Sequence, residues 1–166
     1  MTCYENYPAR HVILNLAQLA AAAIVGLKLM AQVGWWAVGL YGLVGGLGTI
    51  LSLAWGCTRC HYYGRMCGLA LGKLAALGFQ KRPEHEFGRG RSQTLAWSLV
   101  GLALAMPLIA GLIFLSANPI LSAVALTLVY LVLVVAIALT HSRLVCGRCL
   151  MGEQGLCRLG RVTRPT

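Results

Sequence analysis

Acidic side chains are almost absent from this chain of 166 residues. Its four acidic residues are all glutamates, aspartate does not occur, and charged residues make up 11% of the chain. Soluble domains average about 25% charged residues, so the composition excludes an ordinary soluble enzyme, a disordered tail and a coiled coil. Hydrophobic residues make up 58% of the chain, and its mean hydropathy is +0.74. The sequence therefore predicts an integral membrane protein.

The long apolar stretches contain no acidic residue, and several enzyme motifs are missing. A proton or cation pathway through a membrane usually needs an ionisable acidic group, so this absence disfavours a pump or secondary transporter. The chain also lacks a phosphate-binding glycine loop, a serine nucleophile elbow and an H-E-x-x-H motif. Whether the protein is an enzyme stays open at this point.

Four apolar stretches are long enough to cross a bilayer, which takes about 20 residues per helix. They cover residues 12–32, 35–55, 95–115 and 119–140. The first two and the last two are joined by only a few residues, and backbone groups in lipid must be satisfied internally. We therefore expect an all-α fold of two helical hairpins. In the second stretch, we expect Gly42 and Gly46 to pack tightly against another helix of the chain, and a groove for a ligand or lipid is the alternative.

Basic residues fall almost entirely on one side of this topology. Four spans place both termini and the central loop on the same side, and every one of the 14 Lys and Arg residues except Lys28 belongs there. The positive-inside rule makes that side the cytoplasm, so we predict a multi-pass protein of the cell inner membrane with both termini cytoplasmic. We expect it to contact membrane lipids, with anionic head groups on the cytoplasmic side. We also expect a protein partner or a second copy of the chain, and no nucleic acid.

Six of the seven cysteines form two similar sets. The first set is Cys57-Thr-Arg-Cys60 followed by Cys67, and the second is Cys146-Gly-Arg-Cys149 followed by Cys157. Both C-x-R-C motifs come directly after a predicted membrane helix, which indicates duplication of a two-helix unit in the same orientation. We divide the chain into a first repeat (1–79), a cytoplasmic linker (80–93) and a second repeat (94–166). Parallel repeats pack about an axis along the membrane normal, which would bring both cysteine segments together on the cytoplasmic face.

Cytosolic thiols are kept reduced, so these six cysteines are predicted to bind metal rather than to form disulfides. Two C-x-x-C turns supply four thiolates, which suits tetrahedral zinc, the favoured metal, or an iron–sulfur cluster. The neighbouring Arg59 and Arg148 are expected to favour the thiolate form. Two divisions of the ligands stay open: one ion shared by the two C-x-R-C motifs, or a three-cysteine site in each half, completed by His61 and His141.

The function predicted from the sequence is an inner-membrane metalloprotein whose cytoplasmic thiolate site joins the two repeats, as a subunit of a larger membrane assembly. The alternatives are an iron–sulfur electron-transfer subunit and a membrane thiol oxidoreductase. We expect a short helix within residues 64–79, which either lies on the membrane surface or folds back into the membrane. Glu84, His85 and Glu86 are acid–base or metal-ligand candidates, although a solvated linker is favoured there. Cys3 belongs to neither cysteine set and has no assigned role.

Overall fold

The computed structural model describes residues 3–88, 90–117 and 121–153, and this part of the chain is helical with no strand. Four helices are long and apolar enough to cross a membrane, which confirms the prediction of an all-α chain with four membrane-length helices. They are α1 (Ala9–Val33), α2 (Trp35–Leu51), α4 (Arg91–Ala117) and α5 (Leu121–Thr140). Two short helices, α3 (Leu71–Gly78) and α6 (Leu150–Glu153), lie between and after them. Helix α4 begins inside the predicted linker.

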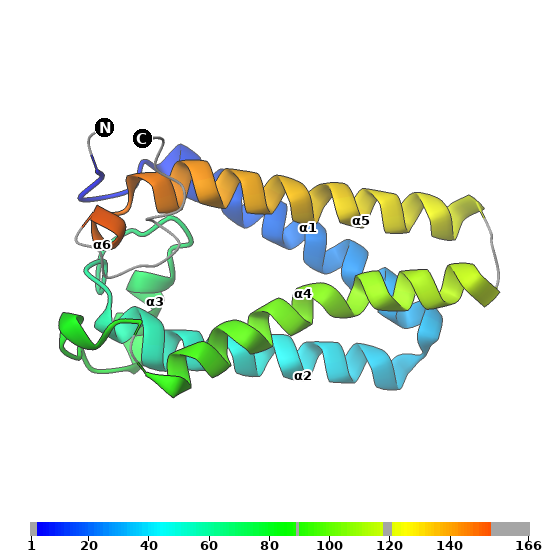
Figure 1. Cartoon of the computed structure of the whole chain (residues 1–166), viewed down its shortest axis with the longest axis horizontal. Coiled ribbons are helices and arrows are strands. Elements are labelled where there is room, and N and C mark those ends of the chain that lie inside the picture. Colours follow the sequence, from blue (N-terminus) through cyan, green and yellow to red (C-terminus); the bar gives the residue numbers. More distant parts are fainter. Residues whose placement is uncertain (1–2, 89, 118–120, 154–166) are drawn as a thin grey trace.

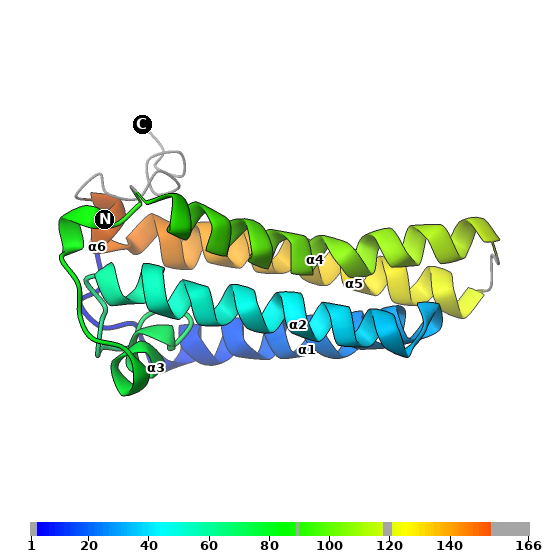
Figure 2. The same ribbon diagram turned by 90° about the horizontal axis from the view of Figure 1, so that it is seen from below.

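The four long helices form a bundle in which α2 and α5 occupy opposite corners. Helices α1 and α4 each pack against α2, against α5 and against each other. Only Gly34 separates α1 from α2. Figures 1 and 2 show that the start of α1, the end of α2, the start of α4 and the end of α5 lie at one end of the bundle, together with α3 and α6. We call this end the cysteine end, because the C-x-R-C motifs follow α2 and α5.

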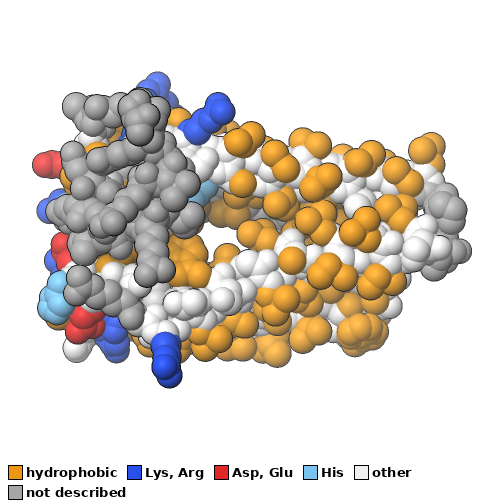
Figure 3. Space-filling view, in the orientation of Figure 1, with side chains coloured by type: hydrophobic (Ala, Val, Ile, Leu, Met, Phe, Trp, Pro, Cys, Tyr) orange, Lys and Arg blue, Asp and Glu red, His pale blue; other side chains and the backbone are white. Residues whose placement is uncertain are grey.

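Most of the bundle surface is apolar and exposed. In the four membrane-length helices, between 17% and 28% of the residues of the most apolar window are buried inside the protein. Figure 3 shows hydrophobic side chains along the helices and charged side chains gathered at the cysteine end. An apolar surface that covers the whole length of a bundle is unstable in water and is suited to lipid. Trp35 and Trp36 are strongly exposed at the far end, where interfacial aromatic residues are common.

Hydrogen bonds of two polar side chains join helices inside the bundle. Tyr130 of α5 is fully buried, and its hydroxyl donates to the carbonyl of Leu104 in α4 at 3.0 Å. The amide of Gln18 in α1 donates to the hydroxyl of Thr140 at 3.3 Å, which links α1 to α5. These polar contacts hold helices together where the surrounding lipid is as apolar as the side chains.

The expectation for Gly42 and Gly46 is wrong. A Cβ atom added at either position would meet nothing within 4 Å, so these glycines face outwards. The opposite face of α2 makes the close contact, because a Cβ at Gly48 would lie 3.1 Å from the backbone nitrogen of Val100 in α4. The sequence shows many glycines in this helix, and packing with α4 selects which of them is buried.

Candidate metal centre

The two C-x-R-C motifs adopt the same local structure. Helix α2 passes into a π-helical turn (Ser52–Gly56) and then a 3₁₀ turn (Cys57–Arg59), and α5 passes into a π-helical turn (His141–Val145) and then a 3₁₀ turn (Cys146–Arg148). In each motif, the backbone N–H of the second cysteine donates to the carbonyl of the first, at 3.3 Å and 3.4 Å. A 3₁₀ turn has three residues per turn, so residues i and i+3 share one side. Each motif therefore presents its two cysteines together.

Cysteines from both segments pack against one buried group of side chains. Its members are Tyr7, Val12 and Tyr62, which are at most 4% exposed. We call this group the aromatic cluster, because the rings of Tyr7 and Tyr62 meet edge to face with centroids 5.3 Å apart. The residues packed around it include Cys60 and Cys67 of the first segment and Cys149 of the second. The fold therefore brings together cysteines that are 82 and 89 positions apart in the sequence.

Residues 3–8 precede α1 and cross both cysteine segments, and we call them the N-terminal strap. The backbone N–H of Tyr4 donates to the carbonyl of Arg148 at 3.2 Å, and that of Tyr7 donates to the carbonyl of Met66 at 3.1 Å. The Tyr7 hydroxyl donates to the carbonyl of Val145 at 2.7 Å. The guanidinium of Arg148 donates to the Tyr4 hydroxyl and lies 5.3 Å from the centre of its ring. Backbone N–H groups of the strap thus donate hydrogen bonds to both cysteine segments.

Tyr62 holds the strap through its side-chain hydroxyl. Its hydroxyl donates to the carbonyl of Tyr4 at 2.6 Å and accepts the backbone N–H of Leu150 at 3.3 Å. One buried phenol in the first cysteine segment therefore bonds both the strap and the residue that follows the second C-x-R-C motif. Buried backbone groups require such partners, because an unpaired one costs about 1–3 kcal/mol.

Cys67 lies in a tight turn that requires glycine. The backbone N–H of Gly72 donates to Cys67 Sγ at 3.4 Å. A Cβ at Gly72 would lie 2.1 Å from the carbonyl oxygen of Tyr62, which no side chain tolerates. A Cβ at Gly68 would lie 2.6 Å from Val145, the residue before Cys146. The loop that carries Cys67 is therefore in direct contact with the second segment.

Burial raises the pKa of the Cys60 thiol to about 12. A neighbouring backbone N–H, that of Tyr62, acts in the opposite direction, and the nearby thiols of Cys149, Cys57 and Cys67 raise the pKa further. This pattern shows that cysteines of both segments lie within electrostatic range of Cys60. Burial also raises the pKa of the Tyr62 hydroxyl to about 12 and that of Tyr7 above its usual value.

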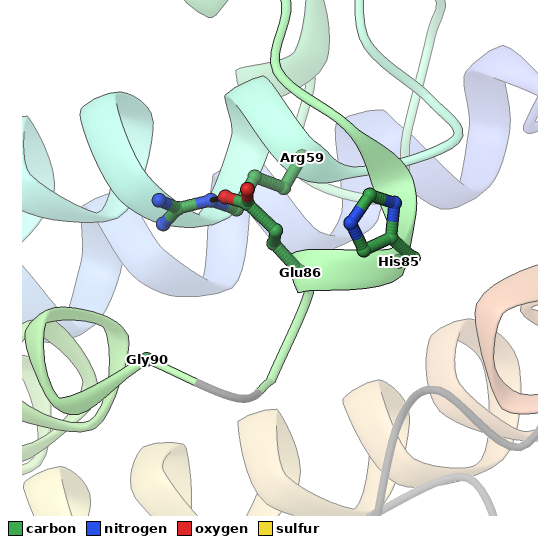
Figure 4. A pocket seen from close by; sticks show the side chains of 4 residues that line it. All are labelled: Arg59, His85, Glu86 and Gly90. Carbon is green, nitrogen blue, oxygen red and sulfur yellow. Dashed lines mark hydrogen bonds and ion pairs between the residues drawn. The ribbon is translucent and has the colours of Figure 1, made fainter.

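The expectation that the neighbouring arginine favours the thiolate is not met at Cys60, because burial raises the pKa of this thiol and Arg59 is not among the groups that shift it. Figure 4 shows Arg59 paired with Glu86 of the linker, with Nε and Oε2 3.0 Å apart. Nη1 of Arg59 donates to the carbonyl of Trp55 at 3.0 Å. The guanidinium of Arg59 therefore joins the linker to the π-helical turn that follows α2.

The linker packs on the outside of the first segment. Arg59, Glu86, His85 and Gly90 line a cavity of about 240 Å³, seen in Figure 4. His61 Nδ1 lies 3.7 Å from the carboxylate of Glu84. His61 therefore contacts the linker.

The predicted ligands are brought together in part. Cys57, Cys60 and Cys67 form no disulfide, and the fold gathers them with Cys146 and Cys149 around the aromatic cluster and the strap. Cys157 lies outside the described residues. Within residues 3–88, 90–117 and 121–153, no three His, Cys, Asp or Glu side chains already stand in metal-holding geometry. Metal binding at these cysteines stays a prediction.

The sequence reasoning missed Tyr4, Tyr7 and Tyr62. The sequence offered one signal for them, because these tyrosines lie near cysteines in the chain. That signal is weak, since aromatic residues are expected at the ends of apolar stretches in any membrane protein. No protein-family model matches this chain, and neither does any curated protein or any solved structure.

Proposed function

We propose that this protein is an integral inner-membrane metalloprotein whose two cysteine segments hold a thiolate-bound metal on the cytoplasmic side. Zinc is the favoured metal, and the site joins the two halves of the bundle. The supporting observation is that Cys60, Cys67 and Cys149 pack on one buried aromatic cluster although they come from separate segments. The matching turns of the two C-x-R-C motifs support duplication of a two-helix unit.

The chemistry of the donors favours zinc. Thiolates are soft ligands, and a set that is enclosed by protein is typical of structural zinc sites, which are closed to substrate. Structural zinc contributes folding free energy directly. Such a site suits α2 and α5, which occupy opposite corners of the bundle and carry the two motifs.

The cytoplasmic location rests on charge. Lys and Arg gather at the cysteine end of the bundle, and the positive-inside rule assigns such an end to the cytoplasm. The same residues face anionic lipid head groups there. The cytoplasm also keeps thiols reduced and available to metal. A small bundle of this kind suits a role as a subunit or as a homo-oligomer.

The test is elemental analysis of anaerobically purified protein, with wild type, Cys57→Ser and Cys146→Ser measured in parallel. We expect zinc in stoichiometric amounts in the wild type and loss of most of it in both variants. His85→Ala is the matched control, because His85 lies in the exposed linker, and it should keep full zinc. Full metal in both cysteine variants would refute the site. Iron with acid-labile sulfide in place of zinc would favour the electron-transfer alternative.

A further inference from the structure

The N-terminal strap is bonded to the cysteine segments in a regular way. The Tyr7 N–H donates to the carbonyl of Met66, and the Tyr7 hydroxyl donates to that of Val145. The Tyr4 N–H donates to the carbonyl of Arg148. Each of these three carbonyls belongs to the residue directly before a predicted ligand, namely Cys67, Cys146 and Cys149. The strap therefore connects the backbone at the third cysteine of the first segment with the backbone at both ends of the second C-x-R-C motif.

The strap has one face in water and one face in the protein. Glu5 and Asn6 are exposed, whereas Tyr7 is 4% exposed and belongs to the aromatic cluster. Cysteines of both segments pack on that same cluster. Figure 1 shows the strap at the cysteine end of the bundle. The strap therefore forms part of the cover between the gathered cysteines and water.

The contacts of the strap are independent of the predicted ligands. The bonds from Tyr4 and Tyr7 end on carbonyl oxygens, and none of the six predicted ligands belongs to residues 3–8. The strap can therefore detach without removing a ligand. A short segment held by a few hydrogen bonds, with one face in water, opens locally at a smaller free-energy cost than a packed bundle. Lids over binding sites are drawn from such segments.

We propose that the N-terminal strap is a gate for the metal centre, and that zinc enters and leaves the thiolates only while Tyr7 is detached from the second cysteine segment. The proposal rests on the proposed function and adds regulation of that same site. Exchange is a ligand substitution, in which each thiolate that leaves the zinc takes up a proton and a donor atom of the acceptor replaces it, so no electron is transferred. Because the ligands are unchanged, a weaker gate accelerates entry and exit equally and leaves the affinity for zinc unchanged.

The rate of zinc release from the purified full chain tests the gate. Protein in detergent is mixed with a chromogenic zinc chelator, at concentrations where the rate no longer depends on the chelator. Tyr7→Phe keeps the buried ring but removes the bond to the carbonyl of Val145. Loss of such a bond enlarges the open population about 5–30-fold. We expect zinc release to accelerate by that factor, with full zinc content and a wild-type dissociation constant in competition titrations.

Two further variants separate the gate from other effects. Tyr62→Phe removes the bond to the carbonyl of Tyr4, so it weakens the strap from a different side and should also release zinc faster. Tyr63→Phe is the matched control, because its hydroxyl donates at 2.6 Å to the carbonyl of Phe79, outside the strap. It should release zinc at the wild-type rate.

The outcomes distinguish the gate from the metal site itself. Wild-type release rates in both Tyr7→Phe and Tyr62→Phe would overturn the gate, and so would equal acceleration in Tyr63→Phe. Faster release with a matching loss of affinity would also overturn it, because the strap would then stabilise bound zinc and not control its access. In each of these cases, stoichiometric zinc in the wild type leaves the proposed function standing. A wild type that holds no zinc would overturn the proposed function and the gate with it.

Discussion

Removal of the Tyr62 hydroxyl should release the strap from the cysteine segments while the rest of the fold stays intact. Tyr62→Phe removes the donor to the Tyr4 carbonyl at 2.6 Å and the acceptor of the Leu150 N–H at 3.3 Å, while the buried ring stays in place. The two backbone groups are then left without these partners. Each lost hydrogen bond contributes about 1 kcal/mol, with more where the remaining partner stays buried. Only the bond to Tyr4 holds the strap, so we expect the strap to be destabilised by about 1–2 kcal/mol, which corresponds to an open population about 5–30 times larger.

Hydrogen exchange measured by mass spectrometry on peptides from the N-terminal segment detects this opening. Exchange of the Tyr4 and Tyr7 amides should accelerate by about 5–30-fold in Tyr62→Phe, because both amides donate to the cysteine segments. Tyr63→Phe is the matched control. Its hydroxyl donates at 2.6 Å to the carbonyl of Phe79, which lies outside the strap. Equal exchange in the two variants would refute the role assigned to Tyr62.

Three further predictions follow from individual residues. Gly72→Ala should reduce metal content and thermal stability strongly, because its Cβ would lie 2.1 Å from a carbonyl oxygen, whereas Gly78→Ala, with nothing within 4 Å, should be nearly neutral in both measurements. In protein stripped of metal, alkylation of Cys60 should be slow at pH 8 and should rise about tenfold per pH unit until the pH approaches 12, since only the thiolate reacts. A rate that levels off below about pH 7.5 would instead favour the thiol oxidoreductase alternative. Fluorescence of Trp35 should be quenched by nitroxide near the lipid head groups more strongly than by nitroxide deep in the acyl chains, because that side chain is 84% exposed at the start of α2, and the opposite order would contradict an interfacial position.

The membrane helices could be predicted because bilayer thickness imposes a length on each apolar stretch. The predicted starts of the first and third stretches lie three and four residues inside α1 and α4, since a helix continues past the lipid boundary into polar residues such as Arg10 and Arg91. The short helix expected within 64–79 forms as α3, eight residues long. Which side of α2 packs against α4 could not be predicted, because the glycines of α2 lie on several sides of the helix. Only the contact with α4 buries Gly48.

Only those parts of the candidate centre that depend on residues close together in the sequence could be predicted. A repeated C-x-R-C motif after two membrane helices is visible in the sequence, and both copies adopt the same turn. The strap was not predictable, because Tyr7 bonds a carbonyl 138 positions away and Tyr62 bonds one 58 positions away. Bonds of that kind connect a side chain with a backbone group, so no pattern of residue types encodes the partner.

The position of the strap bears on how the bundle holds together. Lipid supplies no hydrophobic drive for helix association, so helices in a membrane rely on close packing and polar contacts. Helices α2 and α5 occupy opposite corners of the bundle, and both cysteine segments extend from them. Contacts at the cysteine end, through the strap, the aromatic cluster and Gly68, are therefore what connects the two segments directly. A metal bound there would add to an existing connection and would make the spacing between the ends of α2 and α5 sensitive to its presence.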